Sequence, residues 1–133
     1  CCEGGPEVLN DPAVAIVGSR RPSPYGRAVA GKLAGELASR GLAITSGLAV
    51  GIDACAHWGA LKEGRTMAVL GSGLDVMYPR VNRGLAEKIA EQGAVVTEFP
   101  LGTAPLRENF PVRNRIISGL ILGLVVGLYR RMT

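Results

Sequence analysis

Short apolar runs alternate along this chain with longer segments of helical character, and this alternation limits the possible folds more than any other feature. Each run is apolar on both faces, which is typical of parallel strands that other elements cover. The runs are Val14–Gly18, Leu42–Thr45, Met67–Leu70, Ala94–Thr97 and Leu120–Val126. Strands that alternate with helices in this way favour repeated strand–helix–strand units. We therefore predict an α/β fold with a parallel sheet and helices on both of its faces.

Helix signals fill the segments between these runs. Ser23 followed by Pro24 is a favoured helix start, and Gly41, Gly64 and Gly93 are suited to helix ends. The expected helices run from Pro24 to before Gly41, from about Asp53 to Glu63, from the cap residue Asn82 to Glu91 and, as a short element, around Arg113–Ser118.

The composition is that of one globular domain. The 133 residues are 47% hydrophobic and 20% charged, which is unlike a disordered chain. A net charge of +4 favours an anionic partner only weakly, because many basic proteins bind nothing acidic. The spacing of Cys1, Cys2, Cys55 and His57 suits neither a disulfide framework nor a zinc site, so we expect no metal. Since no signal peptide is recognised, we expect a cytoplasmic protein.

Small residues and arginines gather just after the apolar runs. Because the carboxyl ends of parallel strands meet at one edge of a sheet, these groups are expected to face a common ligand there. Glycines let backbone N–H groups approach a phosphate, and arginine binds phosphate through two hydrogen bonds at once. Taken singly, each small residue could equally be a turn residue. The candidate phosphate-binding residues are Gly18, Ser19, Arg20, Ser46, Gly47, Gly71, Ser72, Gly73, Arg80, Arg107, Phe110, Arg113, Asn114 and Arg115.

Some groups near this edge allow more than one interpretation. Residues 47–53 could form a phosphate loop before a helix, or a flexible connection capped by Asp53. Phe110 could contact a base or plug the core. Asp53, Asp75 and Glu98 could bind a ribose hydroxyl or a cation, or they could cap helices and pair with arginines.

No set of residues indicates catalysis. His57 is expected within a helix, where a lone histidine is more often structural than catalytic. The Gly71-Ser72-Gly73 stretch starts like a dinucleotide fingerprint, but Val76 stands at its third glycine position. No P-loop is present, and no nucleophile, base and orienting group share a diagnostic spacing. We expect no catalytic residue and no cofactor.

Four linked motifs resemble the DNA-processing protein A family, known as DprA or Smf. They are Ala15-Ile16-Val17-Gly18-Ser19-Arg20, the stretch from Ser46 to Asp53, the stretch from Gly71 to Pro79 with Asn82, and the stretch from Phe110 to Gly119. The resemblance covers roughly Val14 to Leu120, in the order that the family has. It implies an extended Rossmann-like domain that binds single-stranded DNA without strong sequence preference.

The resemblance also implies partners and roles for particular residues. It implies a homodimer that acts in natural transformation and delivers strands to the RecA recombinase for recombination. The DNA-contacting arginine of the family matches Arg20, its later basic positions resemble Arg80 and Arg107, and its aromatic residue matches Phe110. The alternative is a nucleotide-processing enzyme of the phosphoribohydrolase kind on a related fold, although the Gly-Gly-Gly-Thr loop of those enzymes is absent.

The ends of the chain depart from the family pattern. Members carry more chain at the start and continue, after Leu120, through a valine-rich strand to further strands and helices. We therefore expect residues 1–133 to be a single, partial Rossmann-like domain that is incomplete at its C-terminus. Gly119, Gly123 and Gly127 have the spacing of a membrane-helix contact face, but their apolar stretch is shorter than the ~20 residues that a span needs. A buried strand is the better interpretation.

Overall fold

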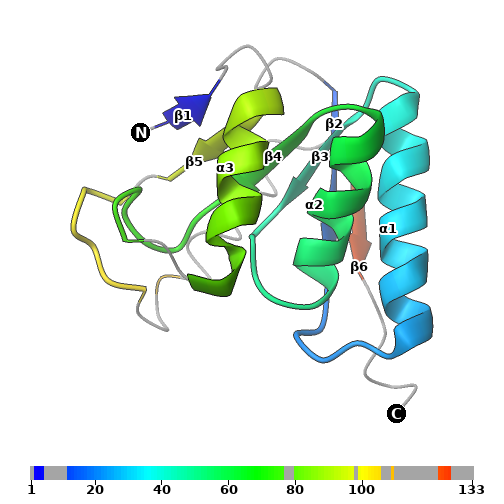
Figure 1. Cartoon of the computed structure of the whole chain (residues 1–133), viewed down its shortest axis with the longest axis horizontal. Helices are drawn as coiled ribbons and strands as arrows, with labels where there is room; N and C mark the ends of the chain where they lie inside the picture. The colour runs from blue at the N-terminus through cyan, green and yellow to red at the C-terminus, as the bar shows by residue number, and fades with distance from the viewer. Residues whose placement is uncertain are drawn as a thin grey trace.

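The computed structural model describes residues 2–4, 12–76, 80–97, 99–105, 109 and 123–126. This part of the chain forms a six-stranded sheet and three α-helices (Figure 1). The strands are β1 (Cys2–Gly4), β2 (Ala13–Val17), β3 (Ala43–Ser46), β4 (Thr66–Val69), β5 (Ala94–Val96) and β6 (Gly123–Val126). The helices are α1 (Pro24–Ser39), α2 (Ile52–Glu63) and α3 (Arg83–Gln92), and a 3-10 turn, η2 (Arg80–Asn82), comes directly before α3.

The strand order is β1-β5-β4-β3-β2-β6. Strands β2 to β6 pair in parallel, whereas β1 is antiparallel to β5. From β2 the chain adds β3, β4 and β5 on one side and then places β6 on the other side of β2. This reversal is a topological switch point, where α/β sheets of this kind bind their ligands. All five predicted strands are present and parallel; β1 is an addition that the sequence patterns do not predict.

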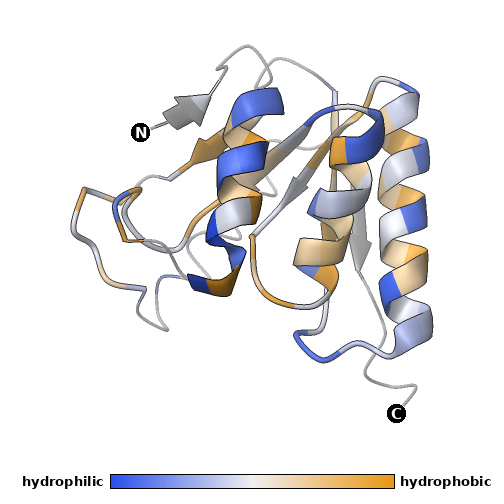
Figure 2. Ribbon diagram, viewed as in Figure 1, coloured by the Kyte–Doolittle hydropathy of each residue, from blue (hydrophilic) through white to orange (hydrophobic). Residues whose placement is uncertain are grey.

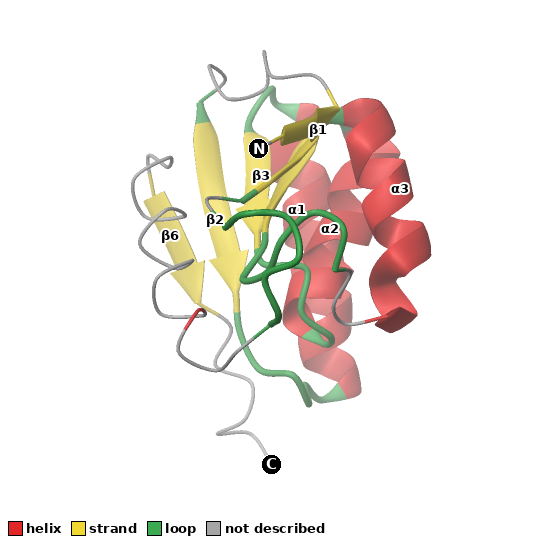
Figure 3. Ribbon diagram, turned by 90° about the vertical axis from the view of Figure 1, so that its left-hand side faces the viewer, coloured by secondary structure: helices red, strands yellow, loops and turns green. Residues whose placement is uncertain are grey.

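Both faces of the sheet are buried, as the apolar runs predict. On one face Ile16 and Ile44 pack against α1 and α2, while Ala68 and Val95 pack against α3. The cluster on the opposite face consists of Ala13, Ala43, Met67 and Ala94. Figure 3 shows α1, α2 and α3 on the same side of the sheet. The expected helix around residues 113–118 lies outside the described residues, so helices on the opposite face stay a prediction.

The helices begin at the edge of the sheet where the parallel strands end (Figure 1). At the start of α1 the Ser23 side chain accepts a hydrogen bond from the Gly26 N–H at 3.1 Å, and Pro24 is the first helical residue, as predicted. Gly64 ends α2 and Gly93 ends α3, also as predicted. Among the described residues, no helix combines the length and apolar character that crossing a bilayer would demand.

Two predicted helix caps differ from what the structure shows. The N-cap of α2 is Gly51, and Asp53 lies one residue inside the helix, in its first turn. Asn82 is the N-cap of α3, but its side chain makes no capping hydrogen bond. Both side chains instead bond to the loop that follows β3, so their contribution is to tertiary structure.

Candidate functional site

Four loops of the described residues lie at the carboxyl ends of the parallel strands. They follow β2 (residues 18–23), β3 (47–51), β4 (70–76) and β5 (97–105, without 98). Together with Ser46 at the end of β3, they hold eight of the candidate residues: Gly18, Ser19, Arg20, Ser46, Gly47, Gly71, Ser72 and Gly73. Arg80 follows in η2. Arg107, Phe110, Arg113, Asn114, Arg115 and Glu98 lie outside the described residues.

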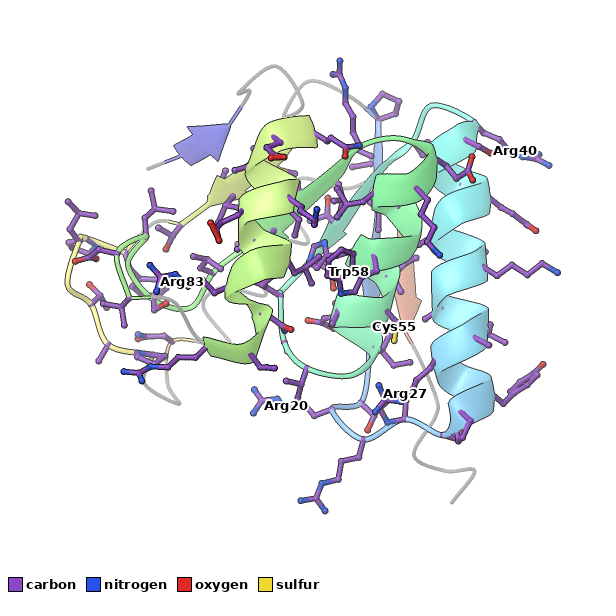
Figure 4. The ribbon with its side chains drawn as sticks, in the orientation of Figure 1. Arg20, Arg27, Arg40, Cys55, Trp58 and Arg83 are labelled. Atoms are coloured by element: carbon purple, nitrogen blue, oxygen red, sulfur yellow. The ribbon has the colours of Figure 1, made fainter. Side chains whose placement is uncertain are left out.

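The loop after β2 rests on the start of α2. The Ile52 N–H donates to the Ser19 carbonyl at 3.0 Å. A Cβ atom on Gly51 would lie 2.8 Å from the Cα of Arg20, and Gly51 has a φ of 89°. This backbone contact fixes the position from which the Arg20 side chain projects. Arg20 is exposed, and Figure 4 shows it at the end of the molecule where α1 and α2 begin. Figure 2 shows part of this loop as a hydrophilic stretch.

The polar groups that follow β3 are engaged within the protein. The Ser46 hydroxyl is buried and donates to the Ile16 carbonyl at 2.5 Å, which ties β3 to β2. The Gly47 N–H donates to the Asp53 carboxylate at 3.1 Å. The Asp53 side chain is itself only 4% exposed. In this structure these three residues shape the loop, and the Asp53 carboxylate contacts the loop backbone.

The loop after β4 is joined to the loop after β5. The Gly73 N–H donates to the Thr103 carbonyl at 3.0 Å, and the Asn109 side chain donates to the Gly71 carbonyl at 3.0 Å. The Ser72 hydroxyl donates to the Val76 carbonyl at 2.8 Å. Gly71, Ser72 and Gly73 are all buried at the bend that follows β4. The Asp75 carboxylate accepts from the Gly102 N–H at 2.6 Å.

Arg80 is connected to the same edge through Asn82. The Asn82 side chain donates to the Leu48 carbonyl, across 34 positions of sequence, at 2.9 Å. Arg80 stands two residues earlier in the same turn and is exposed. Leu48 and Gly51 belong to one loop, so the segments of Arg80 and Arg20 are both fixed to it. The structure thus brings these two predicted arginines to a common edge.

Arg83 is a further basic residue that the candidate set lacks. A hollow of about 790 Å³ lies between the loop after β4 and the first turns of α3, and both Arg80 and Arg83 line it. Its other lining residues are Leu74, Asp75, Val76, Ala86 and Glu87. Figure 4 shows Arg83 beside the start of α3. The spacing of three between the two arginines is the sequence signal, because residues three apart share a helix face.

The helix starts add to the positive character of this edge. A helix N-terminus carries a partial positive charge, which a first-turn carboxylate would offset. The first turns of α1 and α3 contain no acidic residue, whereas α2 has Asp53. Three exposed arginines at this edge (Arg20, Arg80 and Arg83), together with two uncompensated helix starts, suit a chain of phosphates better than a single small anion.

His57 is part of the core. It is fully buried in α2, with Nδ1 2.7 Å from the Thr66 hydroxyl. That hydroxyl donates its one proton to the Ile44 carbonyl at 2.7 Å, so it must accept from the His57 N–H. The bond joins α2 to β4, which is the structural role that its helical position predicts.

A known protein family matches almost the whole chain. The sequence model described as DNA recombination-mediator protein A matches residues 1–128. The chain belongs to this family. The resemblance of its four motifs to DprA and Smf proteins is therefore confirmed.

Relatives in this family are similar over most of the chain. Protein Smf of Escherichia coli is 50% identical over 126 residues, which are 93% of this chain and 34% of that protein. Protein Smf of a Synechocystis strain is 50% identical over 86% of this chain and 29% of its own length. DNA processing protein DprA of Streptococcus pneumoniae is 45% identical over 93% of this chain and 44% of its own. The chain thus spans less than half the length of these relatives.

Two solved structures have the same fold. DNA processing protein A from Streptococcus pneumoniae superposes with a TM-score of 0.89 at 44% identity, over 94% of this chain and 44% of that one. DNA processing protein A from Helicobacter pylori, reported with structural insights into its unique single-stranded DNA binding mode, gives a TM-score of 0.88 at 35% identity. That match covers 94% of this chain and 58% of the other. The predicted α/β, Rossmann-like fold is confirmed.

Proposed function

We propose that this chain binds single-stranded DNA, without catalysing a reaction on it, along the carboxyl edge of its parallel sheet. The observation that carries the proposal is the attachment of the Arg20 and Arg80 segments to one loop, residues 47–51. Two exposed guanidinium groups on one edge can contact successive phosphates of a strand. The single-stranded DNA binding reported for the relative from Helicobacter pylori supports the choice of ligand.

Backbone contacts account for binding that does not depend strongly on sequence. Arginines and helix N-termini recognise phosphates, which are the same in every sequence. Among the candidate residues that the structure describes, Arg20 and Arg80 are the charged ones. We propose that Arg107, Arg113, Asn114 and Arg115 extend this contact and that Phe110 stacks on a base.

For the complete protein, we propose a cytoplasmic homodimer that delivers DNA strands to the RecA recombinase during natural transformation. The family description, a mediator of DNA recombination, supports this role. The chain corresponds to less than half of the relatives compared above, so the recombinase contact is to be sought in the complete protein.

The direct experiment is a fluorescence-anisotropy titration of the chain with a labelled single-stranded oligonucleotide at two salt concentrations. We expect micromolar or tighter affinity that falls steeply with salt, with a log–log slope of about 0.7 for each neutralised phosphate. Oligonucleotides of different sequence should bind within a few-fold of one another. A folded chain that shows no salt-sensitive binding would contradict the proposal.

A second assay distinguishes binding from catalysis. The chain is incubated with nucleoside monophosphates, and free base is measured by chromatography. We expect no release of base above the buffer control. Steady release that depends on the chain would favour a phosphoribohydrolase-like enzyme instead.

A further inference from the structure

Leu48 has a backbone conformation that residues with a large side chain rarely adopt. Its φ is 63°, and it is the one non-glycine residue with positive φ in the described part of the chain. Such a conformation persists only where its surroundings hold it in place. The Leu48 side chain is fully buried with Leu70 and Leu85, and its carbonyl accepts the hydrogen bond from Asn82. The loop after β3 is therefore held by packing and by one side-chain amide.

The Asn82 side chain bonds to this loop rather than to its own helix. At an N-cap, asparagine ordinarily accepts a hydrogen bond from a backbone N–H of the first helical turn. Here the side chain caps nothing in α3 and donates to Leu48 at 2.9 Å. Asn82 is only 8% exposed, so losing this bond would leave a buried polar group without that partner.

The Asn82–Leu48 bond lies between the two described arginines of the proposed DNA contact. Arg80 is in the same 3-10 turn as Asn82. Leu48 is three residues before Gly51, whose backbone lies against that of Arg20. A change in the Asn82–Leu48 separation would therefore change the separation of Arg80 from Arg20.

We propose that Asn82 is a positioning residue for DNA binding: by holding the Leu48 carbonyl, it sets the spacing at which Arg20 and Arg80 reach one strand. This inference rests on the proposed single-stranded DNA binding. It assigns to Asn82 a role without contact to DNA, exerted through the loop after β3.

A double-mutant cycle tests the inference. The affinity and salt dependence for a labelled single-stranded oligonucleotide are measured for the unmodified chain, Asn82→Ala, Arg80→Ala and the double variant. We expect Asn82→Ala to weaken binding about five- to tenfold, the size of one lost buried hydrogen bond. The salt slope should fall by roughly 0.7 if one phosphate contact is lost. In the Arg80→Ala background, Asn82→Ala should lower the DNA affinity less than twofold, because the arginine that Asn82 positions is gone.

Two further variants separate positioning from stability. Asn82→Ser keeps a favoured N-cap and adds no charge, but its side chain is too short to reach Leu48, so it should lose affinity as Asn82→Ala does. Gln92→Ala removes an exposed amide-to-carbonyl bond, from Gln92 to Leu61 at 3.0 Å, at the other end of α3. We expect Gln92→Ala to bind DNA within twofold of the unmodified chain. Circular dichroism and thermal unfolding show which variants are folded.

The possible outcomes are distinct. Folded Asn82→Ala or Asn82→Ser protein that binds within twofold, with an unchanged salt slope, would overturn the positioning role. The positioning role would also be overturned if the fold losses in DNA affinity from Asn82→Ala and Arg80→Ala multiplied in the double variant, as those of independent residues do. No binding by the unmodified chain would instead overturn the proposed function, and the positioning role with it.

Discussion

The backbones of Gly51 and Arg20 are in direct contact at the carboxyl edge of the sheet. A Cβ atom at position 51 would lie 2.8 Å from both the Cα and the carbonyl carbon of Arg20, and still closer to the Ser19 carbonyl oxygen. The contact joins the β2 loop, at the topological switch point, to the start of α2. Any side chain at position 51 must therefore move the arginine loop, the helix start or both.

Gly51→Ala should destabilise the protein and weaken DNA binding together. Position 51 has a φ of 89° and no room for a methyl group, so we expect a loss of roughly 2–4 kcal/mol in the free energy of unfolding. Urea denaturation measures the loss, and anisotropy measures the affinity of protein that remains folded.

Gly41→Ala is the matched control for Gly51→Ala. Gly41 also has a φ of 89°, but a Cβ atom there would meet nothing within 4 Å. We expect a loss of only about 1 kcal/mol, from backbone strain alone, and unchanged DNA affinity. Equal losses for the two variants would show that the Gly51–Arg20 contact adds nothing.

Gly59→Ala should destabilise the protein at a position away from the carboxyl edge of the sheet. A Cβ atom on Gly59, in α2, would lie 2.8 Å from the Cα of Gly31, in α1, so the two helices must separate. We expect a cost of roughly 1–3 kcal/mol in the free energy of unfolding.

A Cβ atom on Gly84, in α3, would meet nothing within 4 Å, so Gly84→Ala should stabilise by about 0.5–1 kcal/mol. Thermal unfolding of both variants checks the two signs.

Thr66→Val should show how much the buried His57–Thr66–Ile44 hydrogen-bond chain contributes. The valine has nearly the same shape, but it cannot accept from His57 or donate to the Ile44 carbonyl. We expect a loss of roughly 2–4 kcal/mol, because two buried polar partners lose this hydroxyl. Thr66→Ser keeps the hydroxyl and should cost less than half as much. A loss for valine no larger than that for serine would contradict a dominant contribution of the hydroxyl.

The sequence predicts most of the fold because its signals are local. Ser23 and Pro24 start α1, and Gly64 and Gly93 end the next two helices, since each acts within a single turn. The apolar runs predict all five parallel strands for the same reason. β1 is different: it has only three residues, and its pairing with β5 joins positions far apart in the chain.

The candidate site is less predictable because its important contacts are long-range. Asn82 has the sequence signature of a helix cap, yet its side chain bonds to Leu48, and no local pattern indicates that partner. Ser46 has the signature of a ligand group at a strand end, but parallel pairing puts the Ile16 carbonyl within reach of its hydroxyl. Polar residue types can thus be placed at the edge from sequence, while the direction in which each side chain bonds requires the fold.

The most direct test of the account compares Arg20→Ala with Arg40→Ala. Each variant removes one exposed arginine, and the two residues lie toward opposite ends of the molecule, Arg40 being the C-cap of α1 (Figure 4). We expect Arg20→Ala to weaken single-stranded DNA binding at least tenfold for every sequence tested and to lower the salt slope by about 0.7, while Arg40→Ala binds within twofold of the unmodified chain. Equal effects of the two substitutions would contradict a DNA contact at the carboxyl edge of the sheet.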